Sequence, residues 1–287
     1  MADATHGLGG LKYDPAKRTR APEWNVFGAL VLIVVIFEVL NRLQGGSFLF
    51  NMRDNVDSLF NQQRLDIMIL QVAIIGVIAL GVTQVIIIGG IDLSSGSVVG
   101  ATAMVVMSFA QTALVNGNPN PKAIFGDWAM DLPVIVPIVI GLACGLFAGL
   151  INGLLVAYTK IPPFIATLGM MVSARGAARW WSNGQPVSFP TAEYGTLANG
   201  DILGGMTFGL LSWPGQNPAV VFVVLALLFH VIMTYTLYGK RSYAIGSNEA
   251  AARMSGINVD RHKVLVYAIA GLLAAVAAVL LTSKNLT

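Results

Sequence analysis

Hydrophobic residues occur in long runs along nearly the whole chain, separated by short polar segments. A helix that crosses a bilayer needs about 20 mostly apolar residues. By this measure the runs that predict spanning helices are Asn25–Leu43, Leu65–Ile88, Val98–Val115, Leu132–Tyr158, Phe164–Trp181, Pro218–Tyr238 and Val264–Thr282. The pattern predicts an all-α, polytopic integral membrane helical bundle with about seven or more spans.

The fifth run is the least apolar, since it contains Arg175 and Arg179. Trp180 and Trp181 follow directly, and tryptophan concentrates where a membrane meets water. We therefore interpret this part of the run as the interfacial end of a helix.

A polar segment, Gly239–Lys263, lies between the last two runs and holds five of the 17 Lys and Arg residues. Within it the sequence predicts a short helix over Asn248–Gly256. Ser247 or Asn248 can cap its first amides, and Glu249 suits the positive first turn. Gly256 can end it in the left-handed conformation, with Ile257 as the usual apolar partner. So short a helix is marginal alone, so we expect a membrane surface or another protein to hold it.

The composition excludes an ordinary soluble domain, because 55% of the residues are hydrophobic, only 11% are charged and the mean hydropathy is +0.72. The net charge of +3 does not indicate nucleic-acid binding, since the cations lie at the ends of apolar runs, where they set membrane topology. Cys144 is the one cysteine, which excludes an intrachain disulfide and a thiolate cluster.

The distribution of cations predicts which side each loop occupies. With the N-terminus inside, the cytoplasmic segments hold ten of the 17 Lys and Arg residues: Lys12, Lys17, Arg18, Arg20, Lys160, Lys240, Arg241, Arg253, Arg261 and Lys263. Ser182–Pro218 has no Lys or Arg, and Asn116–Asp131 has only Lys122. The positive-inside rule places these two loops outside. We therefore expect a cytoplasmic N-terminal segment over residues 1–24 and a single transmembrane domain over 25–287, with a cytoplasmic loop at 239–263.

Four glycines at a spacing of four lie on one face of the fourth predicted helix: Gly141, Gly145, Gly149 and Gly153. Small residues at this spacing allow two helix backbones to approach closely, which indicates packing within a bundle or a dimer. Asn152, next to this ladder, is a candidate for a hydrogen bond between helices or for a solute contact.

The segment GGIDLSSGS, Gly89 to Ser97, interrupts an apolar stretch with an acid and three hydroxyls. Asp92 or Ser94 can cap the following helix. Two interpretations remain open: a plain turn between helices, or a broken helix whose irregular backbone lines a water-filled path. Under the second, the candidate pathway residues are Asp92, Ser94, Ser95, Ser97, Gln84 and Asn152.

Sequence motifs for catalysis are missing. The chain has no GxxxxGK[ST] phosphate loop, no HExxH and no GxSxG, so we expect it not to be an enzyme and to bind no cofactor itself. His6, His230 and His262 lie in different parts of the predicted topology, namely the N-terminal segment, a span and the loop 239–263, so we expect no shared metal site.

Three stretches together resemble one known family: VTQVIIIGGIDLSSGSVVG (82–100), INGLLVAYTKIPPFIATLGM (151–170) and YAIGSNEAAARMSGINVDRHKVLVYAIAGLLAA (243–275). This combination is similar to the membrane-spanning permease of ribose-type bacterial ABC sugar importers. The resemblance implies a bacterial inner-membrane permease, usually a homodimer, that receives a monosaccharide or polyol from a periplasmic binding protein. It also implies that a separate cytoplasmic subunit binds ATP and Mg²⁺ and supplies the energy.

The resemblance identifies the short helix as the element that docks into the ATPase. The candidate coupling residues are Asn248, Glu249, Ala250, Ala251, Arg253 and Gly256. Permeases of this superfamily often have Glu-Ala-Ala, three residues and then Gly, whereas here four residues precede the glycine. Relatives usually continue beyond the point that corresponds to Thr287, so we expect either a miscounted run or a shortened chain.

The alternative function is an ion-gradient-driven secondary transporter, for which Glu38 and His230 are the candidate ionisable residues within spans. The sugar stays open, since Thr83, Gln84 and Asn152 all suit a hydroxyl-rich ligand.

Overall fold

The computed structural model describes residues 22–44, 62–200, 207–208, 211–212 and 217–285. The chain divides into two units, of which the first ends at Leu65 and the second begins at Asp66. The first unit contains helix α1 (Pro22–Leu43), which confirms the first predicted span. Glu38 and Arg42 form an ion pair at 3.1 Å on this helix. The alternative function, an ion-gradient-driven transporter, uses Glu38 as an ionisable residue within a span. In the structure the positive charge of Arg42, one turn away, compensates the Glu38 carboxylate.

The second unit is a helical bundle. Its helices are α2 (Gln62–Ile87, beginning in the last residues of the first unit), α3 (Ser95–Ala110), α4 (Ile135–Tyr158), α5 (Pro163–Trp181), α6 (Ala192–Asn199), α7 (Asn217–Tyr235), α8 (Leu237–Ser247), α9 (Glu249–Met254) and α10 (Val259–Asn285). A 3-10 turn, η1, covers Asp127–Ala129, and two antiparallel hairpins pair β1 (Leu114–Val115) with β2 (Asn118–Pro119) and β3 (Thr207–Phe208) with β4 (Leu211–Ser212).

Every predicted apolar run contains a helix, and the all-α membrane class is confirmed. Within the described residues, α1, α2, α4, α7 and α10 are long and apolar enough to cross a membrane, and α3 is a shorter apolar helix. The less apolar fifth run forms α5, which begins with Pro163 in its first turn, where the missing N–H costs nothing.

The third predicted span, Val98–Val115, is wrong at its end, because α3 stops at Ala110. The chain then forms the β1–β2 hairpin, whose tip is Asn116-Gly117 with φ of 52° and 79°. Positive φ at both central residues defines a type I′ turn, for which Asn-Gly is a favoured pair. The sequence therefore contains a hairpin signal, Asn116-Gly117. In the structure the chain forms this hairpin instead of continuing the helix, although the apolar residues continue to Val115.

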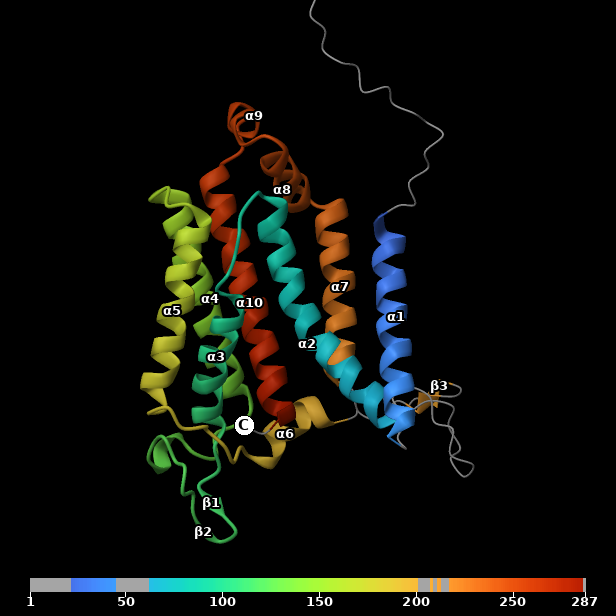
Figure 1. The fold of residues 1–287 in the computed structure, drawn as a ribbon. Coiled ribbons are helices and arrows are strands. Elements are labelled where there is room, and N and C mark those ends of the chain that lie inside the picture. The colour runs from blue at the N-terminus through green and yellow to red at the C-terminus, as the bar shows by residue number, and fades with distance from the viewer. Residues whose placement is uncertain (1–21, 45–61, 201–206, 209–210, 213–216, 286–287) are drawn as a thin grey trace, which may run out of the picture. The chain divides into compact units, whose positions relative to one another are not determined.

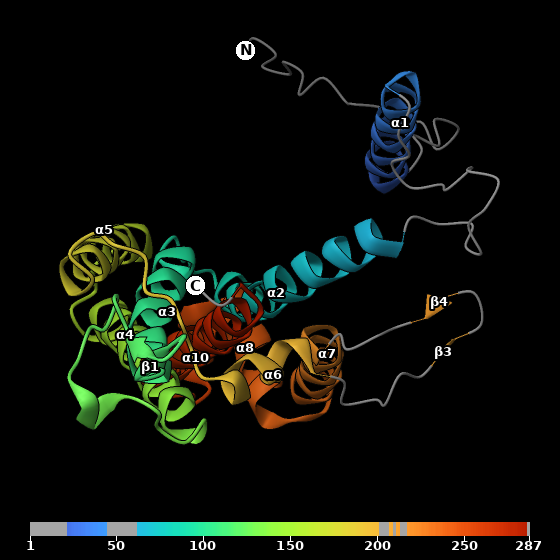
Figure 2. The same cartoon turned by 90° about the horizontal axis from the view of Figure 1, so that it is seen from below.

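Helix α10 lies at the centre of the bundle, with α3 and α4 on one side and α2 and α7 on the other (Figure 2). It approaches α4 through the glycine ladder. A Cβ added at Gly145 would overlap the carbonyl oxygen of Gly271, and one added at Gly149 would overlap that of Tyr267. The ladder thus packs α4 against α10 within one chain.

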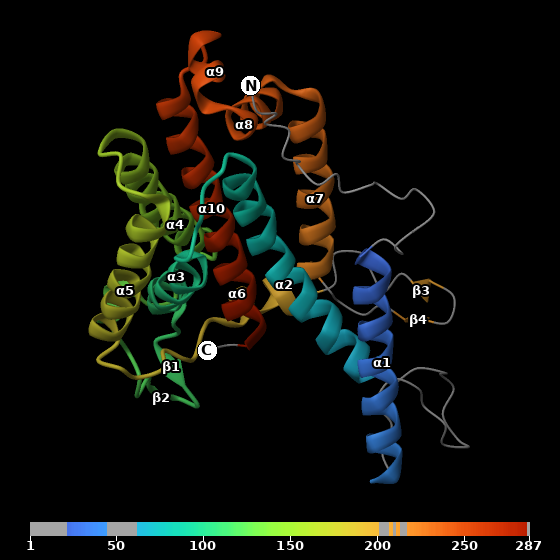
Figure 3. The same ribbon diagram turned by 45° about the horizontal axis from the view of Figure 1, so that its top comes forward.

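Two ends of the bundle can be distinguished (Figures 1 and 3). One carries α8, α9 and the α4–α5 turn, and we call it the α9 end. The other carries α6, the β1–β2 hairpin and η1, and we call it the α6 end. Two of the segments that cation counting assigned to the cytoplasmic side, the one with Lys160 and the loop 239–263, therefore lie together, since Lys160 and Asp260 pair at the α9 end.

Helix α8 was not predicted, because its glycines and cations obscure any apolar periodicity. Tertiary contacts explain it. A Cβ at Gly239 would overlap the Met233 carbonyl where the chain turns sharply out of α7, and a Cβ at Gly246 would overlap the carbonyl oxygen of Ile87 at the end of α2. Glycine at these two positions lets α8 lie against α7 and α2.

Candidate functional site

The short helix α9 has both predicted ends. The Asn248 Oδ1 atom accepts the Ala251 N–H at 3.0 Å, which caps the first turn. At the other end Gly256 has a φ of +80°, its N–H bonds the Arg253 carbonyl at 3.0 Å, and the next N–H, of Ile257, bonds the Ala252 carbonyl at 3.1 Å. This pair of bonds is the Schellman motif.

Ion pairs fasten α9 to the bundle. The Arg253 guanidinium binds the Asp260 carboxylate through two hydrogen bonds of 2.7 and 3.0 Å. Lys160, in the α4–α5 turn, binds the same carboxylate at 2.6 Å. Glu249 accepts from Arg253 at 2.9 Å and from Lys263 of α10 at 2.7 Å. The five side chains form a continuous network that joins α9, α10 and the end of α4.

The sequence interpretation missed three members of this network, Lys160, Asp260 and Lys263. No local pattern could have found Lys160, because it lies 100 positions from its partner Asp260. Lys160 itself has a φ of +58°, and its ammonium also donates to the Ala157 carbonyl at 2.5 Å. A cation at a helix C-terminus is favourable, so Lys160 serves both α4 and Asp260.

Two neighbouring cations favour the ionised form of the Glu249 carboxyl. The Lys263 ammonium, and then the Arg253 guanidinium, hold the pKa of the Glu249 carboxyl below its ordinary value of 4.5. A lowered pKa means that the pairing stabilises the fold above pH 4.5 and is lost as the pH falls through the lowered value. The Glu249 carboxylate therefore stays ionised throughout the neutral range.

Helix α9 presents most of its surface outward. Ala252 is its buried residue, at 4% exposure, whereas Ala250, Ala251 and Arg253 are exposed. Met254, a large apolar side chain that the sequence interpretation had not singled out, is 89% exposed.

Helix α8 connects α9 to the transmembrane helices through polar contacts. The Ser242 hydroxyl and the Nε2 atom of buried His262 lie 2.8 Å apart, which joins α8 to α10. The Tyr238 hydroxyl donates to the Gln84 Oε1 atom at 2.6 Å, which joins α8 to α2. The structure thus places Gln84, a candidate pathway residue, in a contact between helices.

The segment between α2 and α3 is not a surface turn. From the end of α2 it runs back into the bundle, and α3 begins only part of the way down (Figure 1). The carbonyl of Ile91 lies 3.4 Å from the hydroxyls of Thr167 on α5 and Tyr267 on α10. Irregular backbone is tolerated at membrane depth only inside protein or beside a water-filled cavity. The plain-turn interpretation is therefore wrong.

The polar candidates of this segment gather around Asp92. Its Oδ1 atom accepts the Ser94 N–H at 2.8 Å and the Ser94 hydroxyl at 2.6 Å, and its Oδ2 atom accepts the Ser95 hydroxyl at 3.1 Å. Ser94 occupies the N-cap position of α3 but makes no capping bond with its side chain, so that prediction is wrong. Asn152 on α4 donates to the Ser94 Oγ atom at 2.9 Å. Ser97 instead meets Arg175 on α5.

The α6 end is tied together by buried polar groups. Gln111 is fully buried, and its amide donates to the carbonyls of Lys122 and Ser188 at 2.8 and 3.0 Å. The Tyr194 hydroxyl lies 2.6 Å from the Thr282 Oγ1 atom of α10, and burial raises the pKa of Tyr194 to about 12. The two loops assigned to the outside therefore form one connected surface.

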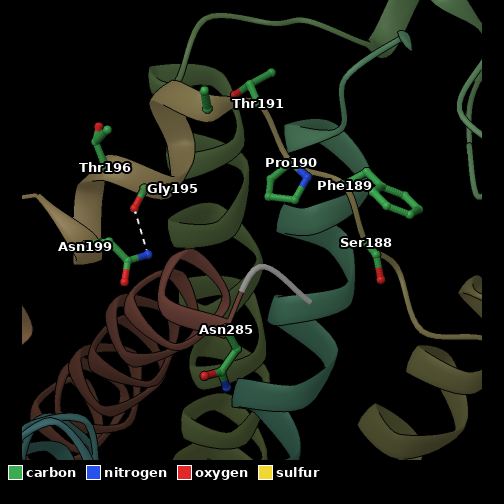
Figure 4. Close-up of a pocket in the computed structure, with 9 residues that line it drawn as sticks. Ser188, Phe189, Pro190, Thr191, Gly195, Thr196, Asn199 and Asn285 are labelled. Atoms are coloured by element: carbon green, nitrogen blue, oxygen red, sulfur yellow. Dashed lines mark hydrogen bonds between the residues drawn. The ribbon is translucent and has the colours of Figure 1, made fainter. Parts of the chain in front are cut away.

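A cavity of about 670 Å³ opens beside α6 at this end (Figure 4). Five of the nine residues that line it carry a side-chain hydroxyl or amide, namely Ser188, Thr191, Thr196, Asn199 and Asn285, and the other four are Phe189, Pro190, Ala192 and Gly195. Asn199 is held by a hydrogen bond of 3.1 Å to the Gly195 carbonyl. None of the candidate pathway residues contributes to this cavity.

The fold and these sites define a polytopic membrane permease with a short helix exposed at one end. Residues 64–285 match the family described as branched-chain amino acid transport system / permease component, and the chain belongs to this family. It is 35% identical over 259 residues to the ribose import permease protein RbsC of Bacillus subtilis, covering 90% of this chain and 67% of the relative.

Two further relatives are also sugar permeases by name. The ribose import permease protein RbsC of Escherichia coli strain K12 is 30% identical, covering 88% of this chain and 67% of that protein. The xylose transport system permease protein XylH of the same strain is 33% identical, covering 75% of this chain and 63% of that protein. No solved structure matches the chain. The resemblance to ribose-type ABC importer permeases is confirmed, and the chain is a multi-pass membrane permease of an ABC importer.

Proposed function

We propose that this chain moves a monosaccharide or polyol from the periplasm to the cytoplasm and is coupled to a separate ATPase through residues 247–256. The observation that carries the coupling is the position of α9. It is exposed at one end of the bundle, and its ion pairs reach both α10 and the end of α4. The solute class rests on the relatives, which are named as ribose and xylose permeases.

The fastening of α9 supports a mechanical role. A helix of six residues has little stability of its own. The network joins it to α10, and α10 is packed against α4 by glycine contacts that leave no room for a side chain. Movement of a docked ATPase would therefore reach α9, α10 and α4 together. Transport then needs two states of the bundle that contact the ATPase differently, while ATP and Mg²⁺ are bound by the partner.

Charge distribution supports placing the α9 end in the cytoplasm. The described segments of this end carry Lys160, Lys240, Arg241, Arg253, Arg261 and Lys263. The described loops of the α6 end, residues 111–134 and 182–200, carry one cation, Lys122, and the helix ends beside them add Arg179 and Lys284. By the positive-inside rule the α6 end then faces the periplasm of a bacterial inner membrane, with residues 1–24 cytoplasmic. That N-terminal segment lies almost wholly outside the described residues.

The α6 end suits a binding protein that delivers the solute. It exposes Leu114 at 60% and Trp128 at 72%, and the same end carries a cavity with five hydroxyl- or amide-bearing residues in its lining. Exposed aromatic and apolar side chains beside polar groups are typical of protein contacts. We include a second copy of the permease among the partners, as the family resemblance implies.

The proposal is tested by co-purification with the ATPase subunit encoded for the same importer. Deletion of residues 247–256 should abolish recovery of the ATPase, and Met254→Asp should weaken it by roughly tenfold, because a buried charge replaces an apolar contact. Arg261→Gln is the matched control, since it changes an exposed cation outside the network. Equal recovery with Met254→Asp and the control would contradict docking through α9.

Replacing Gly256 by valine should uncouple the permease while membrane insertion persists. Gly256 has a φ of +80° with nothing within 4 Å of an added Cβ, so the strain is in the backbone alone. A β-branched residue there costs about 1–2 kcal/mol, which a six-residue helix cannot absorb. We expect solute-stimulated ATP hydrolysis to fall several-fold in the reconstituted complex. Gly256→Asn, which tolerates this conformation, should retain most of it, and equal activity of the two variants would argue against the assignment.

A further inference from the structure

Two contacts set the relative level of α3 and α5, which run side by side in the same direction (Figure 1). Near their ends at the α6 side, the Trp181 indole donates to the Ser108 hydroxyl at 3.0 Å. Further into the bundle, the Arg175 Nε atom donates to the Ser97 hydroxyl at 3.0 Å. The interfacial tryptophans therefore provide a reference from which the depth of Arg175 can be measured.

With Trp181 taken as the interfacial residue that the sequence indicates, the guanidinium of Arg175 is placed deep in the membrane. Ser97 is 11 residues from Ser108 along α3, which at 1.5 Å per residue is about 16 Å. Along α5 the Cα of Arg175 is only about 9 Å from that of Trp181. The side chain thus reaches away from the near interface, in the direction that helical side chains tilt. With a hydrocarbon core of about 30 Å, the charged group lies near the midplane.

This position differs from the interfacial one that the sequence suggested for Arg175. A long basic side chain facing lipid normally extends toward the nearer headgroups, and this one extends the opposite way. Arg175 is nevertheless exposed, and among the described residues no carboxylate forms an ion pair with it. A guanidinium with these properties needs water or a polar ligand beside it, since exposure to lipid at this depth is costly.

The neighbouring surface of α3 is open. Gly96 and Gly100 are both exposed, and a Cβ added at either would meet nothing within 4 Å. Ser97, between them, is buried and holds the Arg175 side chain. The surface formed by Gly96, Gly100 and Arg175, which we call the α3–α5 face, thus presents a fixed cation next to free space at mid-membrane.

We propose that the α3–α5 face lines the solute path and that Arg175 binds a hydroxylated solute there. The guanidinium carries five N–H donors. The Nε–H is used to hold Ser97, which leaves the four N–H groups of the outer nitrogens for ligand oxygens. A planar, fixed set of donors suits adjacent hydroxyls of a sugar or polyol. This inference rests on the proposed function, for which it supplies a residue that determines solute affinity.

Transport kinetics of the assembled importer test the role of Arg175. With ribose as the probe, Arg175→Met should raise the KM for uptake at least about tenfold, because a charged donor to a buried ligand is lost. Recovery of the ATPase subunit should not change, since α9 is untouched. Arg179→Met is the matched control on the same helix, one turn nearer the interface, and should leave the KM within about twofold. Arg175→Lys should rescue part of the loss, because it keeps the charge but not the planar donors.

Thiol accessibility tests the path independently of transport. In a Cys144→Ala background, Gly100→Cys should react with a charged, membrane-impermeant thiol reagent, and ribose should slow the reaction. Leu227→Cys, which lies on the exposed face of α7, is the lipid-facing control and should not react. Failure of the unmodified complex to take up ribose or xylose would count against the proposed function. Normal uptake together with an unchanged KM for Arg175→Met and an inert Gly100→Cys would overturn the role of the α3–α5 face alone.

Discussion

Gly149→Val is expected to yield a permease that inserts into the membrane but cannot be purified as a single folded species. A Cβ at this position would overlap the Tyr267 carbonyl oxygen and lie 3.0 Å from the Cα of Ala268 and 3.1 Å from that of Gly271. All three atoms belong to the backbone, so no side chain can move aside. The two helices must separate, at a cost of about 3 kcal/mol or more, the upper part of the range for overpacked cores.

Size-exclusion profiles and thermal unfolding of the detergent-extracted protein measure this effect. Any folded fraction should show an unfolding midpoint lowered by about 10 °C. Gly169→Val is the matched control: it lies mid-helix in α5, is exposed, and has nothing within 4 Å of an added Cβ. A Gly149→Val protein as stable as the control would show that α4 and α10 do not pack through the ladder.

Asp260→Asn is expected to uncouple ATP hydrolysis from transport without unfolding the protein. The Asp260 carboxylate is shared by Lys160 and Arg253, and it is the group that links α9 to both α10 and the α4–α5 turn. Partly exposed ion pairs contribute about 0.2–1 kcal/mol each to stability, so expression and insertion should be unchanged. Loss of two such links, roughly 1 kcal/mol together, should lower solute-stimulated ATPase activity by about fivefold.

Two variants separate the arms of this network. Lys160→Met removes the link from Asp260 to the α4–α5 turn, together with the Lys160 bond to the Ala157 carbonyl, and leaves the Arg253–Asp260 bonds in place, so it should produce a smaller loss of stimulation than Asp260→Asn. Arg261→Gln, at the adjacent position, should behave as the unmodified protein. Stimulation and transport by Asp260→Asn at the level of Arg261→Gln would mean that the Asp260 links are not needed, and that α9 transmits movement through its backbone connections and the Glu249–Lys263 pair.

The helices of the bundle and the caps of α9 could be predicted because their causes are local. Apolar runs fix α1, α2, α4, α7 and α10, since a bilayer demands about 20 consecutive apolar residues. Asn248 and Gly256 cap α9 through neighbours within five positions. The end of α3 was missed although its signal, Asn116-Gly117, is local too. There the hydropathy of the run was given more weight than the turn.

The candidate site was only partly predictable. The polar segment around Asp92 was identified from composition, but its return into the bundle depends on contacts with Thr167 and Tyr267, which are 76 and 176 positions from Ile91. Helix α8 depends in the same way on the fit of Gly246 against the end of α2. The sequence contains these residues but no local pattern that pairs them.

The sequence by itself determined the class of protein, the positions of the apolar helices, the family and the capped helix over Asn248–Gly256, because hydropathy and capping act over a few residues. Only the tertiary structure decided which groups meet. It placed Asp260 between Arg253 and Lys160, and it joined Arg175 on α5 to Ser97 on α3. These pairings depend on helix packing and on close backbone approach, and both are properties of the folded bundle.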